Sequence, residues 1–279
     1  MWTPDHRRAA ARHGPRYPSD LTDAEWALVE PLIPPAKRGG RRRSVNLREV
    51  LNAIFYVLST GCQWNALPKD LPPKSTVYDY LDLWDWDGTL ERIHHTLYVA
   101  VARARRTRGE PDGRNHRQSK RQGCAKGGST LDPSGYDAGK KVTGRKRHIL
   151  VDTLGLMLNV AVHSADIQDR DGAPRVLDAR TRRFFPFIEH IFADGGYQGS
   201  QLARRLARTG SWLIEIVKRP HIPRFEVLPK RWIVERTLAW ISRCRRLARD
   251  FERHLRKAAA FVRLAMIRLM LRRLARPSS

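Results

Sequence analysis

Cysteine is scarce in this 279-residue chain, and its three cysteines have no Cys-x-x-Cys spacing. This argues against a disulfide framework and a zinc site, and it fits a reducing compartment. Long apolar runs are also missing, because charged residues interrupt each one before the roughly 20 residues that a membrane span needs. The N-terminal segment is basic and has no apolar signal-peptide core. We therefore expect a cytoplasmic protein without a membrane segment.

Acidic residues are few relative to basic ones. Lys and Arg number 53 against 28 Asp and Glu, which gives a formal net charge of +25 at pH 7. This excess goes far beyond what solubility requires, so it predicts a polyanionic partner. Nucleic acid is the first candidate, and an anionic membrane surface is the second. With 41% hydrophobic residues, the chain can still build one large core or two ordinary ones.

The N-terminal part predicts helices. A capping box, Thr22 with Glu25, opens the first, and further amphipathic helices are expected at residues 47–58, 75–84 and 90–101. We interpret residues 17–106 as a small all-α, helix-turn-helix-like DNA-binding domain that follows a basic arm at residues 1–16. A purely structural helical cap is the alternative, because the third helix carries acids that would repel phosphates. These acids are Asp79, Asp82, Asp85 and Asp87.

A cationic run with two glycines connects the first two expected helices, at residues 37–43. Charge runs are usually only solvated, but this composition suits a flexible loop that contacts phosphates. We expect Arg41, Arg42 and Arg43 to bind DNA.

The stretch from Ala102 to Thr130 contains no Val, Ile, Leu, Met, Phe, Trp or Tyr. It therefore predicts neither a strand nor a core helix, and we assign residues 107–134 to a disordered linker. Residues 135–279 then predict an α/β domain. Its expected elements are a hairpin at 148–162, a helix opening at 169–171, a strand at 190–193, a helix at 200–208, a strand at 212–217 and a helix from 231.

Asp194 directly follows the short apolar strand expected at residues 190–193, and three glycines come after it. The carboxyl ends of strands are where α/β folds place their chemistry, and glycines leave room for a ligand or metal. The alternative is that Asp194 only caps the helix starting near Ser200.

Glu235 lies at the edge of the apolar stripe of the last-mentioned helix, among several arginines. A half-buried carboxylate is costly unless it is paired or binds a cation. The alternative to a functional role is a salt bridge to Arg231, one turn earlier.

Several strings occur together and in order, and they resemble those of bacterial insertion-sequence DDE transposases, specifically of the insertion-sequence 5 group within the 4/5 superfamily. They are Gly135-Tyr-Asp-Ala-Gly-Lys-Lys141, Gly144-Arg-Lys-Arg-His148, Val151-Asp-Thr-Leu-Gly155, Ala165-Asp-Ile-Gln-Asp-Arg-Asp-Gly172, Ala193-Asp-Gly-Gly-Tyr197, Leu228-Pro-Lys-Arg-Trp-Ile-Val-Glu-Arg-Thr237 and Ala265-Met-Ile-Arg-Leu269. The resemblance spans nearly the whole chain.

The resemblance implies an RNase H-like mixed sheet flanked by helices, with an Asp-Asp-Glu metal triad. Asp194 would be its second Asp and Glu235 its Glu, both holding Mg²⁺ or Mn²⁺. The implied function is metal-dependent phosphodiester cleavage and strand transfer on double-stranded DNA, both the element's terminal inverted repeats and target DNA. The implied assembly is a homodimer associated with the nucleoid. We add Lys141, Arg145, Lys146, Arg231 and Arg236 to the expected DNA-binding residues.

One string departs from the family. The Ile-Asp-Ser-Gln-Ser string, which holds the family's first Asp, is replaced here by residues 114–121, Arg-Asn-His-Arg-Gln-Ser-Lys-Arg. Synonymous codons can be chosen for these residues that, read one base later, encode Ile-Ile-Asp-Ser-Gln-Ser. We therefore hypothesise a frameshifted segment that includes at least residues 110–126. Asp112 is a poor substitute for the lost acid. Asp152, on the expected hairpin, is better placed, but we expect it either to support the metal ligands or to have a structural role. The alternative function is an inactive remnant that binds DNA without cutting it.

Overall fold

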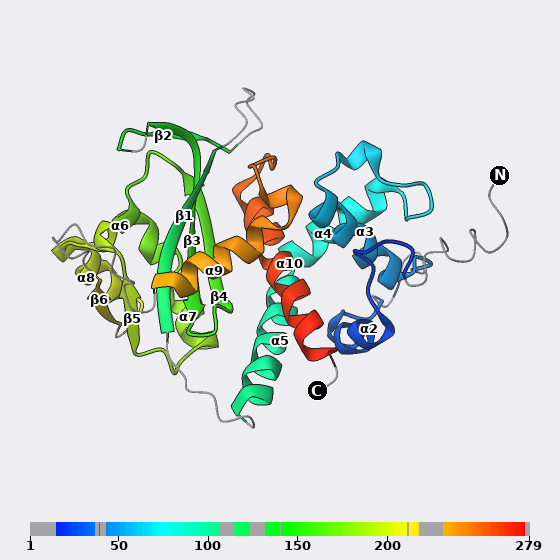
Figure 1. Cartoon of the computed structure of the whole chain (residues 1–279), viewed down its shortest axis with the longest axis horizontal. Helices are drawn as coiled ribbons and strands as arrows, with labels where there is room; N and C mark the ends of the chain where they lie inside the picture. Colours follow the sequence, from blue (N-terminus) through cyan, green and yellow to red (C-terminus); the bar gives the residue numbers. More distant parts are fainter. Residues whose placement is uncertain are drawn as a thin grey trace, which may run out of the picture.

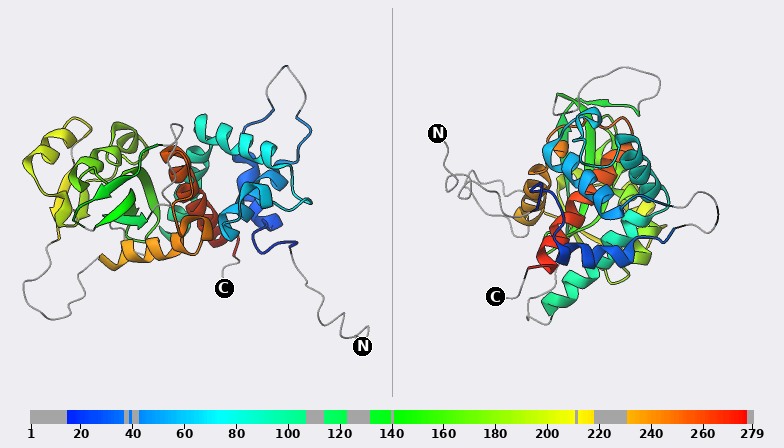
Figure 2. Two further views of the ribbon diagram at one scale, coloured as in Figure 1. Left: turned by 90° about the horizontal axis from the view of Figure 1, so that it is seen from above. Right: turned by 90° about the vertical axis from the view of Figure 1, so that its right-hand side faces the viewer.

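The computed structural model describes residues 15–36, 39, 43–106, 114–122, 132–139, 141–210, 212–217 and 231–276. Within these residues, several helices gather at one end of the molecule, and a mixed sheet with its own helices forms the other end (Figure 1). The long helix α10, Leu255–Leu274, lies between the two ends (Figure 2).

The helical end begins with four helices whose ends follow from local signals. They are α2 (Asp23–Val29), α3 (Leu47–Thr60), α4 (Lys74–Trp86) and α5 (Thr89–Arg106), with 3-10 turns η1 (Glu30–Leu32) and η2 (Trp64–Ala66). The predicted capping box is confirmed: Glu25 N donates to Thr22 Oγ1 at 3.2 Å, and Thr22 N donates to Glu25 Oε2 at 3.0 Å. Gly61 ends α3 with a left-handed φ of 70°.

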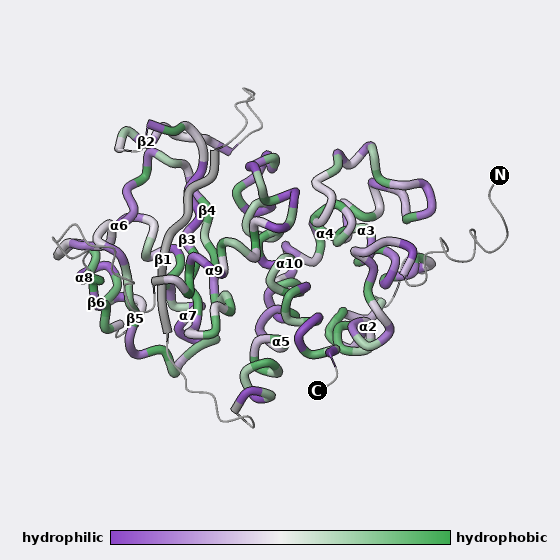
Figure 3. Tube along the Cα trace, in the orientation of Figure 1, coloured by the Kyte–Doolittle hydropathy of each residue, from purple (hydrophilic) through white to green (hydrophobic). Residues whose placement is uncertain are grey.

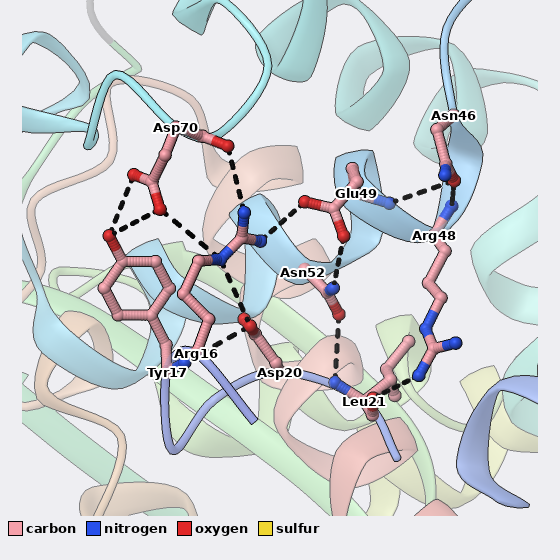
Figure 4. Close-up of polar contacts among 9 residues, drawn as sticks. All are labelled: Arg16, Tyr17, Asp20, Leu21, Asn46, Arg48, Glu49, Asn52 and Asp70. Atoms are coloured by element: carbon pink, nitrogen blue, oxygen red, sulfur yellow. Dashed lines mark hydrogen bonds and ion pairs between the residues drawn. The ribbon is translucent and has the colours of Figure 1, made fainter. Parts of the chain in front are cut away.

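Arg16 ties the start of the described chain to these helices (Figure 4). Its Nη2 lies 2.5 Å from Glu49 Oε2 in α3, and its Nη1 donates to the Asp70 carbonyl at 3.0 Å. Tyr17 OH donates to Asp70 Oδ1 at 2.9 Å. Arg16 therefore belongs to the folded helical end and not to the expected basic arm, because Glu49 of α3 and Asp70 of the turn before α4 hold it. Residues 1–14 of that arm lie outside the described residues.

The acids of α4 are partly engaged within the protein. Arg256 Nη2 at the start of α10 lies 2.6 Å from Asp82, and Lys257 Nζ lies 2.5 Å from the same carboxylate. The hydrogen bond from Lys257 lowers the pKa of Asp82, whereas burial raises the pKa of Asp85. These two acids dock α10 on α4, which favours a structural role for this face of the helix.

One sheet is built from the strands that the structure describes. They are β1 (Arg114–Gln122), β2 (Gly135–Asp137), β3 (Val142–Asp152), β4 (Met157–Ser164), β5 (His190–Ala193) and β6 (Leu213–Ile216). β3 pairs antiparallel with β1 on one side and with β2 and β4 on the other, so the predicted hairpin is confirmed as β3 and β4. β5 pairs in parallel with both β1 and β6. The order β2-β3-β1-β5-β6, with β4 also on β3, puts β1 inside the sheet.

β1 corrects the prediction made for residues 107–134. The sequence predicts no strand there because apolar residues are absent, yet residues 114–122 form β1. A strand is held by its backbone ladder, which any non-proline residue can make, and β1 lies between β3 and β5. Those neighbours carry buried apolar residues such as Ile149 and Ile191. Residues 107–113 and 123–131 lie outside the described residues.

Helices and turns of the second half pack around the sheet. They are α6 (Asp169–Gly172), η3 (Ala173–Arg175), α7 (Ala179–Phe184), η4 (Gly195–Tyr197), α8 (Ser200–Leu206), α9 (Arg231–Ser242) and η5 (Arg245–Leu247). α9 runs across β1 and β3 (Figure 1). α10 packs on β4 and also on α2, α3, α4 and α5, within one continuous core. The predicted division into residues 17–106 and 135–279 therefore does not separate two cores.

Among the residues that the structure describes, we find no helix with the length and hydrophobicity of a membrane span. Polar and apolar residues alternate along α5 and α10 (Figure 3). α5 is amphipathic, whereas α10 has buried residues around most of its surface because it packs against α5, β4 and the other helices.

Candidate functional site

Asp194 lies where the sequence predicts it, at the carboxyl end of β5. Its Oδ1 accepts a hydrogen bond from Gly196 N at 3.1 Å, and its carbonyl accepts one from Tyr197 N at 3.1 Å. The side chain is half-exposed. Asp194 caps the short turn η4 and not α8, whose N-cap is Gly199. The turn thus holds the carboxylate at the sheet edge with part of its surface open to solvent.

Asp169 is a second acid beside Asp194. The sequence predicts only that it lies at the start of a helix. A Cβ built on Gly196 would lie 3.1 Å from Asp169 Oδ2 and 3.2 Å from Asp194 Oδ1, so both carboxylates flank this glycine. Lys146 Nζ holds Asp169 Oδ1 at 2.9 Å. The available signal was the Gly195-Gly196 pair, whose missing side chains allow this close approach.

Glu235 lies on α9, and its surroundings differ from those predicted. The sequence predicts a half-buried carboxylate, but Glu235 is exposed. The buried face of α9 is formed by its neighbours Ile233, Val234 and Thr237. Since the apolar stripe is complete without it, Glu235 is on the solvent side of the stripe's edge. The predicted pairing with Arg231 stays a prediction, because the Arg231 side chain lies outside what the structure describes.

A hairpin turn fixes α9 on the sheet. Thr237 Oγ1 donates to the Gly155 carbonyl at 2.7 Å, and a Cβ on Gly155 would lie 2.7 Å from the same oxygen. Gly155 also has a left-handed φ of 73°. Asp152 shapes this turn by accepting from Leu154 N at 2.9 Å and from Leu156 N at 2.7 Å. The structural role predicted for Asp152 is therefore confirmed.

Cations and aromatic rings gather on α9 next to Glu235. The Arg236 guanidinium lies 4.4 Å from the Trp232 ring centroid and 5.0 Å from that of Trp240. Burial and the nearby Arg105 lower the pKa of Arg236, and burial and Arg105 also lower the pKa of Arg273 to about 10. Such mutual repulsion among cations would be relieved by a bound anion.

Two of the predicted DNA-binding residues are buried, which corrects that prediction. Arg145 is 6% exposed and Lys146 is 4% exposed. Arg145 donates to the carbonyls of Asp132, Glu252 and Arg253 at 2.6–2.9 Å. Its Nη1 also lies 3.3 Å from Asp250. β3 is covered on both sides, so its cations are turned to internal partners instead of phosphates.

The other predicted DNA-binding residues have different outcomes. Lys141 is exposed, with a φ of 51° before β3, and Arg43 is exposed with its Nη1 donating to the Pro34 carbonyl at 3.1 Å. Arg41 and Arg42 lie outside the described residues. These positions stay predictions.

The described side chains fit a divalent cation only in part. Asp194 and Glu235 offer the hard oxygen donors that Mg²⁺ and Mn²⁺ take, on elements that both adjoin β1. Among the described residues, however, no three His, Cys, Asp or Glu side chains come close enough together to hold a metal ion. The acid that would complete the expected triad from β1 is missing, so Asp194 and Glu235 are the two members of that triad that could hold a metal.

Comparison with known families decides the identity of the chain. Residues 85–270, more than half of the chain, match the family model described as a transposase DDE domain. This chain belongs to the DDE transposases. Residues 21–94 match a second model, described as a putative transposase of the IS4/5 family. The DDE domain match begins at the end of α4 and ends inside α10, so in this transposase it spans α5, the sheet and most of α10.

Two relatives of this transposase come from Burkholderia cepacia. One is the insertion element IS402 uncharacterized 16.2 kDa protein, 34% identical over 90 residues, which covers 30% of this chain and 61% of the relative. The other is a putative transposase for insertion sequence element IS402, 31% identical over 128 residues, which covers 43% of this chain and 60% of the relative. The chain thus spans about 60% of the length of these curated relatives. No solved structure matches it.

Proposed function

We propose that this chain acts as the transposase of an insertion sequence, binding the element's terminal inverted repeats and target DNA and carrying out metal-dependent cleavage and strand transfer. The observation that carries the proposal is Asp194, half-exposed at the carboxyl end of β5, within a chain that belongs to the DDE transposases. The net charge of +25 supports DNA as the partner.

The proposed fold of the catalytic region is RNase H-like. Its support is the strand order β4-β3-β1-β5-β6, in which an antiparallel trio is followed by two strands parallel to β1. The helical end, with the exposed Arg43, is proposed as a helix-turn-helix-like DNA-binding region. We further propose that two copies act together on two element ends, in the cytoplasm and at the nucleoid.

Asp194 and Glu235 are the proposed acids of the reaction. When bound, Mg²⁺ or Mn²⁺ would activate water or a 3′-hydroxyl and stabilise the leaving oxygen. The turn around Gly196 orients Asp194, and the docking of Thr237 on Gly155 fixes the helix that carries Glu235. Arg236 and Arg273, which both lie against the Trp240 ring, would hold phosphates near the helix that carries Glu235.

A second candidate function is DNA binding without cleavage. It is favoured by the register of β1, in which Asn115 pairs with Phe192 of β5. Continued two residues along each chain, this register puts Arg117 next to Asp194. A cation would then stand where an acid of the triad is expected, and it would repel a divalent metal.

The test of the proposed function uses a labelled duplex that carries the element's own terminal repeat. Binding is followed as a function of salt, and cleavage is followed with Mg²⁺ and with Mn²⁺. The proposal expects cleavage by the unaltered chain, and loss of cleavage with retained binding in Asp194→Ala and Glu235→Gln. The matched control is Glu215→Gln, because Glu215 is exposed on the neighbouring strand β6. Metal-independent binding by every variant, with no cleavage, would instead support the second candidate.

A further inference from the structure

Three buried side chains form a hydrogen-bonded row directly behind the Asp194 turn. Tyr197 OH lies 2.6 Å from His148 Nδ1, and His148 Nε2 lies 2.5 Å from His163 Nε2. His163 Nδ1 lies 2.7 Å from the Ser164 carbonyl oxygen. Tyr197 is 2% exposed, and both histidines are completely buried. The three come from different elements, η4, β3 and β4, so the row links the turn to the centre of the sheet.

The Ser164 carbonyl at one end of the row determines which atom donates in each of its hydrogen bonds. A carbonyl oxygen can only accept, so His163 Nδ1 must carry a proton. A charged imidazole in so buried a place is costly, so His163 is neutral and its Nε2 accepts. Burial lowers the pKa of His163, in agreement with a neutral ring.

The same reasoning then determines His148. Its Nε2 faces an acceptor and must carry the proton, which leaves Nδ1 as the acceptor in a neutral ring. Tyr197 OH therefore donates to His148 Nδ1. The two rings hold opposite tautomers, with protons on Nε2 of His148 and on Nδ1 of His163.

The space around the two rings is closed by the end of α6. The rings stack with centroids 4.6 Å apart. A Cβ on Gly172 would lie 2.3 Å from His148 Nε2 and 2.4 Å from His163 Nε2. Real side chains do not approach other atoms so closely, so only glycine fits at this position. The backbone of α6 therefore packs directly against the two Nε2 atoms.

We propose that His148 and His163 are positioning residues for Asp194, acting through Tyr197. The row fixes the Tyr197 side chain, and the Tyr197 backbone N–H donates to the Asp194 carbonyl at 3.1 Å, closing the turn that orients the carboxylate. This inference rests on the proposed function only for the use of Asp194. The hydrogen-bond directions and their hold on the turn follow from the structure by themselves.

The row has a defined response to acid. A proton added to His163 Nε2 would put two N–H groups opposite each other, because His148 Nε2 already carries one. The groups acting on His163 besides His148 and Tyr197 are Lys146 and Arg175, which disfavour the added proton, and Asp169, which favours it. Opening of the row, and loss of the turn's geometry, is therefore expected only below the ordinary titration range of histidine.

The first experiment measures the tautomers by NMR of the full chain with isotope-labelled histidine at neutral pH. Correlations between ring nitrogens and ring hydrogens report which nitrogen carries the proton. The expected result is an Nε2-protonated His148 and an Nδ1-protonated His163, assigned with the variants His148→Asn and His163→Gln. A protonated Nε2 on His163, or a protonated Nδ1 on His148, would overturn the proposed row.

The second experiment measures how strongly the row of Tyr197, His148 and His163 stabilises the turn that follows Asp194. Tyr197→Phe keeps the ring and removes only the hydrogen-bond donor. We expect the amide signals of Gly195 and Gly196 to shift. We also expect Mn²⁺ to bind about tenfold more weakly, as followed by its effect on these two signals. His163→Gln keeps an acceptor near Nε2 but cannot titrate, so its turn is expected to stay intact at lower pH than in the unaltered chain. His190→Asn, on the exposed part of β5, is the matched control.

The outcomes separate the two proposals. Unchanged Gly195 and Gly196 signals in Tyr197→Phe, or an acid response of His163→Gln identical to that of the unaltered chain, would overturn the positioning role. If Asp194→Ala still binds Mn²⁺ as the unaltered chain does, the proposed function of Asp194 fails, whereas the amide signals of Tyr197→Phe still decide the role of the row.

Discussion

Asn115 of β1 and Phe192 of β5 are register partners in a parallel pair. If this register continued for two residues along each chain, Arg117 would lie beside Asp194, the residue that directly follows β5. Reading synonymous codons of this segment one base later gives an Asp at the position of Arg117. Codons chosen among synonyms thus allow an Asp at the same position that the extended register indicates. We therefore expect the residue at position 117 to determine whether Asp194 and Glu235 can hold a metal ion together.

Substitutions of Arg145 and Lys141 should distinguish a cation that stabilises the fold from a cation that binds DNA. Arg145→Ala removes three buried hydrogen bonds and leaves Asp250 as a buried acid without its partner, so we expect a loss of about 3–5 kcal/mol in the free energy of unfolding. Lys141→Ala should leave stability unchanged, weaken DNA binding and reduce the salt dependence by about one counterion. Denaturant unfolding and binding titrations at several salt concentrations measure both. A stable Arg145→Ala that binds DNA poorly would contradict this division.

The contact between Thr237 and Gly155 should hold α9 on the sheet. Thr237→Val keeps the shape of the side chain but leaves the Gly155 carbonyl without this donor, with an expected cost of about 1–3 kcal/mol. Gly155→Ala should cost at least as much, because the added Cβ meets Thr237 Oγ1 and the φ of 73° is left-handed. Thermal unfolding measures both effects. Ser242→Ala is the control, since it removes a hydrogen bond of the same kind, to the Leu238 carbonyl at 2.6 Å, one turn earlier in α9.

His94 should make the fold sensitive to acid. Burial, together with Arg263, lowers the pKa of His94 from 6.5 to about 3. Below pH 6.5 the unfolded chain therefore binds a proton that the folded chain does not, and stability falls until the pH reaches about 3. Between pH 6.5 and about pH 5 the expected loss is on the order of 2 kcal/mol.

The measurement for His94 is the free energy of unfolding against pH. His94→Asn should flatten the curve over this interval, even if it lowers stability at neutral pH. Ser242→Ala, a change at a side chain that does not titrate in this range, should leave the slope as it is. Equal slopes in His94→Asn and the unaltered chain would contradict the assignment of acid sensitivity to His94.

The sequence was informative where local chemistry decides the structure. The capping box at Thr22, the glycine that ends α3 and the hairpin of β3 and β4 all follow from patterns within a few residues. Asp194 was located for the same reason, because an apolar strand followed by glycines is a local signal. The Asp152 turn also depends only on its nearest neighbours.

The sequence failed where distant segments decide the structure. β1 is held by strands that follow it in the chain by tens of residues, and its own composition does not predict a strand. Arg145 is buried because carbonyls of residues 252 and 253 reach it, which no neighbouring residue indicates. The row of His148, His163 and Tyr197 depends on three elements meeting behind one turn. Long-range packing of this kind leaves no local pattern.

The account is tested most directly by rewriting β1. In one variant, residues 115–120 are changed to Ile-Ile-Asp-Ser-Gln-Ser, which includes Arg117→Asp, and a second variant adds Asp194→Ala. Cleavage of a duplex carrying the element's end is measured with Mg²⁺ for both, alongside the unaltered chain. The account predicts that the rewritten chain cuts the duplex faster than the unaltered chain and that adding Asp194→Ala abolishes the cutting. Equal cutting by the rewritten chain with and without Asp194 would contradict the role assigned to this acid.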